Sequence, residues 1–428
     1  MKKFLAIIAV LFLVLIILIY WSASSTDKKF VTCSIENIED VEKIDFREHD
    51  SVLVAASTLY EGDLIKRLMQ GENYRKAWST PVQVPIAFLD TLKGGLKIKD
   101  EGGGMQTQSL ELEGENDIKY TLRSVAKDPK KLIPEIAEKL GLENIVVDGI
   151  SGQHPYAAML VAELAETAQV LHTHPQVYFI PKQERLGDLN NKYGNRLYLL
   201  EYELKSDGNW TNLEDIDEII DTDNLQELKL QKGSSLSLDN EMLIRTRLFD
   251  MLIGDWDRHA KQWGWAIQKK KDRYKAIPIP GDRDNAFFKL TGLVPSIITN
   301  KNIEPEIRPF EEDIDHMPGL VYPNDRYFLL KVPKETFIRQ AEILQQNMTE
   351  EKIREAFMVW PKAIAELDQE EITEKLLARK AKLPEYASSF YQIIQEQGEL
   401  TEPMKGSEDI DIPEGLLRCF ECLENSEN

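Results

Sequence analysis

An uncharged apolar segment at the N-terminus, residues 4–21, places the strongest constraint on how this chain can fold. A helix of about 20 apolar residues spans the hydrocarbon core of a bilayer. Lys2 and Lys3 precede the segment, and the positive-inside rule keeps such a basic end in the cytoplasm. We therefore expect a transmembrane signal anchor over residues 1–22 of a single-pass inner-membrane protein. Everything after Trp21 is then expected on the extracytoplasmic, periplasmic side.

A cleaved signal peptide is the alternative interpretation of the same segment. The apolar region of a signal peptide normally has about 7–15 residues, and this one is longer. The residues that follow it, Trp21-Ser22-Ala23-Ser24-Ser25, form only a mediocre cleavage site. We therefore favour the uncleaved anchor.

Composition limits the partners of the remaining chain. Hydrophobic residues make up 42% of the sequence, which is enough for a packed core. The net charge of −21 argues against a nucleic-acid partner, because such binding depends on Lys and Arg that neutralise phosphates. Three cysteines, Cys33, Cys419 and Cys422, lie near the two ends of the chain. In an oxidising compartment Cys419 pairs with Cys422 or one of them pairs with Cys33; unpaired thiols are the remaining alternative.

The pattern of apolar and turn-forming residues predicts an α+β chain in two parts. Strand-like segments and one long helix dominate residues 51–204, whereas helical periodicity covers most of residues 334–398. The expected organisation is a polar stalk at 23–50, a strand-rich N-lobe at 51–204, a helical C-lobe at 205–400 with an acidic surface excursion at 205–238, and a polar tail at 401–428.

Two acidic loops, each with two aspartates, flank one predicted hairpin. The first acidic loop is residues 254–259, with Asp255 and Asp257, and the second acidic loop is residues 281–285, with Asp282 and Asp284. A tight hairpin returns the chain to its start, so we expect the two loops to lie side by side. Four carboxylates repel one another unless a cation joins them, and Mg²⁺ or Mn²⁺ binds carboxylate oxygens. The alternative is a surface network of Asp–Arg ion pairs.

The order of helix, first acidic loop, hairpin and second acidic loop resembles that of the protein-kinase-like fold. The run Asp257-Arg258-His259 is similar to the Asp-Arg-His of its atypical branches, which include lipid kinases, HipA-like kinases, secretory-pathway kinases and CotH-like spore-coat kinases. The resemblance implies a two-lobed phosphotransferase that uses ATP or another nucleotide. Asp257, with Arg258 and His259 beside it, would act on the hydroxyl of an unknown protein or small-molecule acceptor.

The same resemblance implies a metal site. Gln262 stands where those kinases often carry a metal-binding Asn, a departure that keeps an amide oxygen on a longer side chain. Asp284, in Asp284-Asn285, is similar to the metal-binding Asp of the secretory branch, so we prefer it to Asp282 as the second ligand.

A glycine-rich loop between two predicted strands fits the nucleotide-binding lobe. Bare backbone N–H groups can approach an anion closely, and a flexible turn is the alternative. The loop residues expected near the phosphates are Gly102, Gly103, Gly104, Gln106 and Thr107.

A basic residue should follow on the next strand. Arg123 takes the place of the phosphate-pairing lysine of kinases, and Lys127 is the alternative base. Glu163 or Glu166 on the following helix could pair with that base. Glu201 lies in the strand that the resemblance makes the hinge beside the nucleotide.

Residues 50–400 also resemble an uncharacterised bacterial envelope family, common in Bacteroidetes. The resemblance is carried by Asn73-Tyr74-Arg75-Lys76-Ala77-Trp78, the glycine-rich loop, Leu122-Arg123-Ser124-Val125-Ala126-Lys127-Asp128-Pro129, His154-Pro155-Tyr156-Ala157 and the two acidic loops. It implies no activity of its own. Three functions therefore stay open: an atypical kinase, a kinase-like module that binds or scaffolds envelope proteins without catalysis, and a metal-dependent phosphohydrolase.

Overall fold

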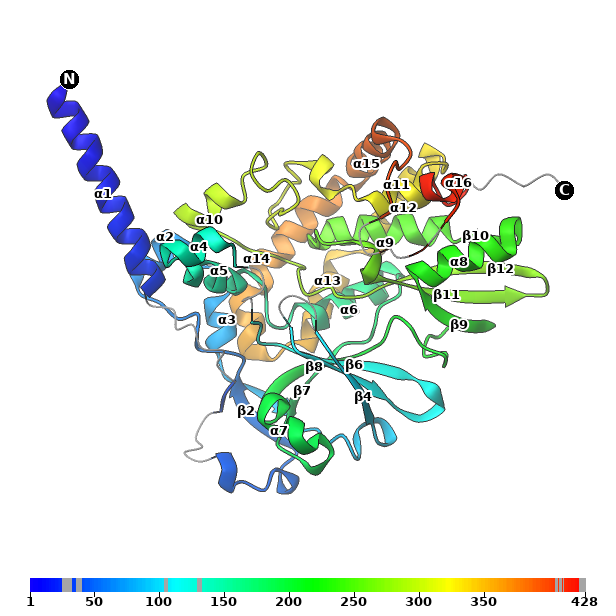
Figure 1. The fold of residues 1–428 in the computed structure, drawn as a ribbon, viewed down its shortest axis with the longest axis horizontal. Coiled ribbons are helices and arrows are strands. Elements are labelled where there is room, and N and C mark those ends of the chain that lie inside the picture. Colours follow the sequence, from blue (N-terminus) through cyan, green and yellow to red (C-terminus); the bar gives the residue numbers. More distant parts are fainter. Residues whose placement is uncertain are drawn as a thin grey trace.

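The computed structural model describes residues 1–24, 33–35, 41–103, 107–128, 133–404, 407, 410 and 412–422. Within them the chain is a mixed α+β protein with one long helix, α1 (Lys2–Ser24), that projects from the body (Figure 1). By length and composition α1 could cross a membrane, because its most apolar window has a mean hydropathy of 3.2 and is not buried.

The segment predicted as a stalk packs against the body in its described part. Residues Ser22 and Ala23 at the end of α1 are buried, and so is Phe46. β1 (Ser34–Ile35) pairs antiparallel with β2 (Ser51–Ala55), which pairs in turn with β3 (Val82–Pro85). The described residues between 33 and 50 therefore contribute apolar side chains to one edge of the core, and the predicted stalk over residues 23–50 stays a prediction.

A five-stranded antiparallel sheet forms most of the N-terminal half. Its strands, in the order β4-β5-β6-β8-β7, are β4 (Lys97–Gly102), β5 (Ser109–Glu113), β6 (Lys119–Ser124), β8 (Arg196–Tyr202) and β7 (Gln176–Ile180). One face buries Leu110, Leu122 and Leu200 in a core of its own. The opposite face, with Leu199, joins the main core, to which α6 (Ala157–Ala168) contributes. This half therefore follows the predicted run of strands with one long helix.

A four-stranded sheet lies beyond it, in the order β10-β12-β11-β9. Its strands are β9 (Ile216–Asp221), β10 (Leu236–Leu238), β11 (Trp263–Lys270) and β12 (Arg273–Pro280). The predicted surface excursion at 205–238 is therefore wrong, because it contains β9, β10 and the helix α8 (Thr222–Lys232). The sequence conceals β9 because only Ile219 and Ile220 of this acidic edge strand are buried.

Helices make up most of the remainder. They are α2 (Leu64–Gln70), α3 (Arg75–Ser79), α4 (Glu135–Leu140), α5 (Glu143–Gly149), α7 (Asn190–Tyr193), α9 (Asn240–Ile253), α10 (Leu293–Ile298), α11 (Pro323–Leu329), α12 (Lys334–Asn347), α13 (Glu350–Ala356), α14 (Lys362–Ala381), α15 (Leu383–Gln397) and α16 (Glu414–Arg418). α12, α14 and α15 pack against α9. Near the C-terminus Cys419 and Cys422 form a disulfide, whereas Cys33 is a buried free thiol.

The central helix α9 has clear start and stop signals. The side chain of Asp239 accepts a hydrogen bond from the backbone N–H of Met242 and caps the first turn. Gly254 ends the helix with a φ of 71°, and a Cβ there would lie only 2.7 Å from the ring of Phe310. The chain therefore leaves α9 at a fixed point and in a fixed direction, directly into the first acidic loop.

Candidate functional site

The hairpin of β11 and β12 brings the two acidic loops together. Trp263 pairs with Pro280 at its open end, and the N–H of Gly281 donates to the carbonyl of Gln262 at 3.0 Å. Arg258 of the first loop donates from Nη1 to the carbonyl of Gly281 at 2.6 Å. The loops therefore lie side by side, as the hairpin in the sequence predicts.

Asp250, near the end of α9, ties both loops to the helix. Its buried carboxylate contacts the guanidinium groups of Arg247 at 3.1 Å, Arg258 at 3.1 Å and Arg283 at 3.0 Å. Arg258 is itself fully buried and also pairs with Asp255. Although predicted among the catalytic residues, Arg258 does not line the cavity described below, and it holds the two loops in place.

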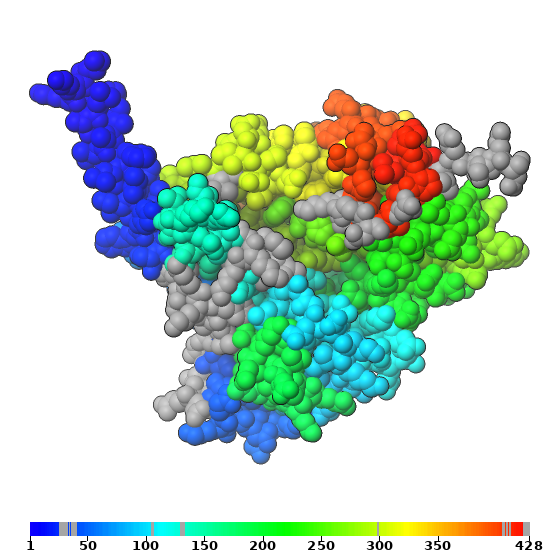
Figure 2. Space-filling view, in the orientation of Figure 1, coloured from blue at the N-terminus to red at the C-terminus, as the bar shows by residue number. Residues whose placement is uncertain are grey.

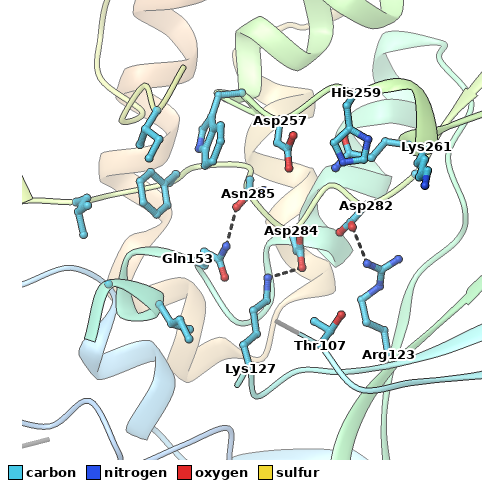
Figure 3. Close-up of a pocket in the computed structure, with 18 of the residues that line it drawn as sticks. Thr107, Arg123, Lys127, Gln153, Asp257, His259, Lys261, Asp282, Asp284 and Asn285 are labelled. Atoms are coloured by element: carbon cyan, nitrogen blue, oxygen red, sulfur yellow. Dashed lines mark hydrogen bonds and ion pairs between the residues drawn. The ribbon is translucent and has the colours of Figure 1, made fainter. Parts of the chain in front are cut away.

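A cavity of about 840 Å³ lies between the five-stranded sheet and the two acidic loops (Figure 3). Nine side chains predicted from the sequence line it: Thr107, Arg123, Lys127, Glu201, Asp257, His259, Gln262, Asp282 and Asp284. Gly102 ends β4 and Gly103 follows it, and neither lines the cavity. Gly104 and Gln106 lie outside the described residues.

Two basic side chains, one on β6 and one just after it, pair with the second acidic loop across this cavity. Lys127 Nζ lies 2.6 Å from Asp284 Oδ2, and Arg123 Nη1 lies 2.6 Å from Asp282 Oδ2 (Figure 3). The Nε of Arg123 also lies 3.3 Å from Oε1 of Glu201 on β8. The two candidate bases are thus not alternatives, because each holds its own carboxylate.

The acid expected on α6 is on β8 instead. Glu163 is exposed, and Glu166 pairs with His172 at 2.7 Å. In the antiparallel pair of β6 and β8, Thr121 lies opposite Glu201 and Arg123 lies opposite Leu199. Glu201 and Arg123 are therefore diagonal neighbours on the same face of the sheet, which lets their side chains meet. Helix periodicity could not reveal this pairing, since it depends on strand register.

Burial and neighbouring charges move the pKa values of the two loop carboxylates in opposite directions. Burial raises the pKa of Asp282 to about 7. The charge of Arg123 acts to lower this pKa, and the charge of Asp284 acts to raise it. Burial also acts to raise the pKa of Asp284, but Lys127, Asp282 and Arg123 outweigh it and lower that pKa. Asp282 is therefore the carboxylate of the pair that takes up a proton first as the pH falls, and Asp284 is the one that keeps its negative charge.

Gln262 and Asp284 offer oxygen ligands to a metal ion. Gln262 Oε1 is buried and, within the described part of the chain, accepts no hydrogen bond. An unsatisfied buried amide oxygen is costly, and a divalent cation beside Asp284 would satisfy it. Asp257 also faces the cavity and forms no ion pair with another described residue, so its carboxylate can act on a substrate. These residues fit Mg²⁺ or Mn²⁺.

The cavity contains residues that the sequence did not single out. Lys261 lies beside His259 at its edge, and Gln153 donates from Nε2 to Asn285 Oδ1 at 2.6 Å (Figure 3). The cavity is also lined by apolar side chains, which we call its apolar wall: Ile145, Val146, Ile150, Leu290, Pro295 and Ile307. No motif marks these positions, because apolar residues in loops and short helices have no distinctive spacing.

A second cluster lies outside the cavity. Ligand-type atoms of Glu166, His172 and His174 lie within 4.8 Å of one another, which would suit a metal. However, Nδ1 of His172 accepts the backbone N–H of His174 at 3.1 Å, so the neutral ring carries its proton on Nε2, which donates to Glu166. Both ring nitrogens of His172 are therefore already engaged in hydrogen bonds.

Comparisons with known proteins give little further information. No family model and no curated protein matches the chain. Among solved structures, a proinflammatory kinase of Helicobacter pylori, CtkA, is similar over 69% of this chain and 96% of its own, with 15% sequence identity and a TM-score of 0.33. A similarity of that size does not assign the fold. The envelope family and the kinase branches inferred from the sequence stay predictions.

Proposed function

We propose that this chain is a membrane-anchored, two-lobed phosphotransferase of the atypical kinase type, which uses a nucleotide such as ATP with Mg²⁺ or Mn²⁺. One observation carries the proposal: two bases, Arg123 on β6 and Lys127 just after it, meet two carboxylates of one loop in a cavity that also contains Asp257. Phosphoryl transfer needs this combination of positive charge for phosphates, oxygen ligands for a metal and a group that acts on the acceptor.

Each residue has one role in this proposal. Lys127 and Arg123 bind phosphate oxygens when they release their carboxylates. Asp284 and Gln262 hold the metal ion, which when bound neutralises charge on the transferred group. Asp257 orients the acceptor hydroxyl and accepts its proton while the oxygen attacks phosphorus. α1 spans the inner membrane, and the body lies on the periplasmic side.

A kinase-like binding module without catalysis is the second candidate. Both carboxylates of the second acidic loop are already neutralised by bases, at 2.6 Å each, and Gln262 replaces the usual Asn. A periplasmic location also favours this candidate, because ATP is scarce there.

Calorimetry with Mg-ATP and Mn-ATP on the full chain separates the candidates. Asp284→Ala should abolish binding, since it removes a metal ligand. Asp257→Asn should bind normally while turnover falls by about 10²–10⁴-fold. Asp313→Asn, which breaks an ion pair with Lys382 away from the cavity, is the matched control.

Absence of nucleotide binding by the unmodified chain would refute the enzyme and leave the binding module. Phosphate release without any acceptor would instead identify a phosphohydrolase.

A further inference from the structure

Six apolar side chains are exposed on three short helices. They are Leu64 and Leu68 of α2, Ile136 and Leu140 of α4, and Leu293 and Ile297 of α10, and we call them the apolar face. Each is at least 51% exposed, whereas large apolar side chains elsewhere in the described body are mostly buried. A concentration of exposed apolar residues usually marks an interaction surface.

The apolar face surrounds the point where α1 leaves the body. α1 packs on α2 and α5, α2 contacts α10, and α4 contacts α5. In Figure 1 these helices lie together at one end of the molecule, and in Figure 2 α1 emerges beside α4. A membrane that contained α1 would therefore begin next to the apolar face.

Hydrogen bonds fix the depth of these helices relative to α1. The hydroxyl of Tyr20 donates to the carbonyl of Leu140 at 2.8 Å, at the end of α4. Nε1 of Trp21 donates to Asp63, the N-cap of α2, at 3.2 Å. Tyr and Trp at the end of a transmembrane helix lie at the level of the lipid headgroups. The groups that Tyr20 and Trp21 bind, at the end of α4 and the start of α2, therefore lie at that level too.

We infer that the apolar face rests in the headgroup and upper acyl region of the bilayer, so that lipid is its occupant. The inference rests on the proposal that α1 spans the membrane, but on no property of the nucleotide site. The six residues carry no charge, and the chain has a net charge of −21, so the contact is apolar and not an attraction to anionic lipid.

Contact of the apolar face with the bilayer would fix the position of the cavity relative to the membrane surface. α5 contacts α1 and contributes Ile145 and Val146 to the apolar wall, and α10 contributes Pro295. Gln70 of α2 lines the same cavity and donates from Nε2 to Ser22 Oγ of α1 at 3.0 Å. Two helices of the apolar face, α2 and α10, therefore also border the cavity, and with α5 they hold its apolar wall at the membrane surface.

Single labelled cysteines test the inference on the full chain in nanodiscs of phosphatidylcholine. Leu68→Cys and Ile297→Cys carry an environment-sensitive fluorophore on the apolar face, and Leu230→Cys on α8 is the matched control at the other end of the body (Figure 1). The native cysteines do not compete for label, because Cys33 is buried and the other two form a disulfide. Quenching is measured with nitroxide attached to lipid and with iodide in water, without nucleotide.

The labels at 68 and 297 should be quenched by lipid nitroxide several-fold more than the label at 230, and iodide should quench them several-fold less. Added salt should not change this pattern. If iodide quenches the labels at 68 and 297 as strongly as the label at 230, the inference is overturned. It is also overturned if neither quencher reaches them, because protein then covers the apolar face. Failure to incorporate into nanodiscs also overturns it. Calorimetry with Mg-ATP on the same variants shows separately whether the proposed nucleotide site has failed.

Discussion

Replacement of Asp250 by Asn should destabilise the body strongly, because this carboxylate neutralises three buried guanidinium groups. In this variant Arg247 still has an ion pair with Asp325 at 2.7 Å. Arg258 still has an ion pair with Asp255 and a hydrogen bond to the carbonyl of Gly281. Arg283 forms its only ion pair with a described residue at Asp250, and it is 6% exposed. Burial lowers the pKa of Arg283 to about 10 even with Asp250 present. Asp250→Asn therefore leaves one buried charge without a partner.

The magnitude follows from that orphaned charge. Removal of one partner of a buried ion pair costs about 3–5 kcal/mol. Arg283→Met removes the charge itself and should cost about 1.5–3 kcal/mol, since Asp250 keeps two other partners. The double variant has no orphaned guanidinium. Its loss of unfolding free energy should therefore be smaller than the sum of the two single losses by about 2 kcal/mol.

Urea titration of all three variants, followed by tryptophan fluorescence, measures these differences. Trp263 and Trp265 are buried in β11 beside the first acidic loop and report on its unfolding. Asp313→Asn, a surface pair, should cost no more than about 1 kcal/mol. If Asp250→Asn costs as little as this control, or if the two effects simply add, the network does not hold the loops as argued.

Three further predictions follow from single positions. Lys127→Ala should weaken Mg-ATP binding by about 10–100-fold in calorimetry, as expected for one charged contact, and unchanged affinity would exclude Lys127 from the site. Burial, together with the charge of His174, lowers the pKa of His172 to about 4, although Glu166 acts to raise it. Between about pH 4 and about pH 6.5, His172 is protonated in the unfolded chain but not in the native chain. The free energy of unfolding should therefore fall as the pH drops through this range. His172→Asn should flatten that slope in urea titrations, whereas the exposed His49→Asn should not. Gly254→Ala should cost at least about 1–2 kcal/mol in the same assay because of its positive φ, and a neutral result would contradict the α9 geometry.

The sequence predicted the central parts of the site because they are local. A hairpin must return to its start, so the side-by-side placement of the two acidic loops follows from the strands that separate them. Arg123 and Lys127 were named as candidate bases because the kinase resemblance expects a base at the end of the strand Lys119–Ser124, which alternating residues make clear. Both features depend on residues within one or two neighbouring elements.

What the sequence missed depends on contacts between distant segments. The acid beside Arg123 is Glu201, 78 residues on, and only the register of β6 and β8 brings them together. Arg258 resembled a catalytic residue because it follows Asp257, but its side chain points into the core toward Asp250. The acidic strand β9 was hidden because it buries only two of its side chains.

The contacts that assemble the cavity also connect it to α1. Lys127 and Gln153 from the first half hold Asp284 and Asn285 from the second, at 2.6 Å each. Tyr74, which follows α2, donates its hydroxyl to the carbonyl of Phe287 at 2.6 Å, two residues beyond the second acidic loop. α2 in turn is packed on α1. The helix α2 therefore contacts α1 and also lines the cavity through Gln70, so it couples the position of α1 to that of the cavity. If α1 spans a membrane as proposed, the packing of α1 on α2 sets the distance from that membrane to the second acidic loop.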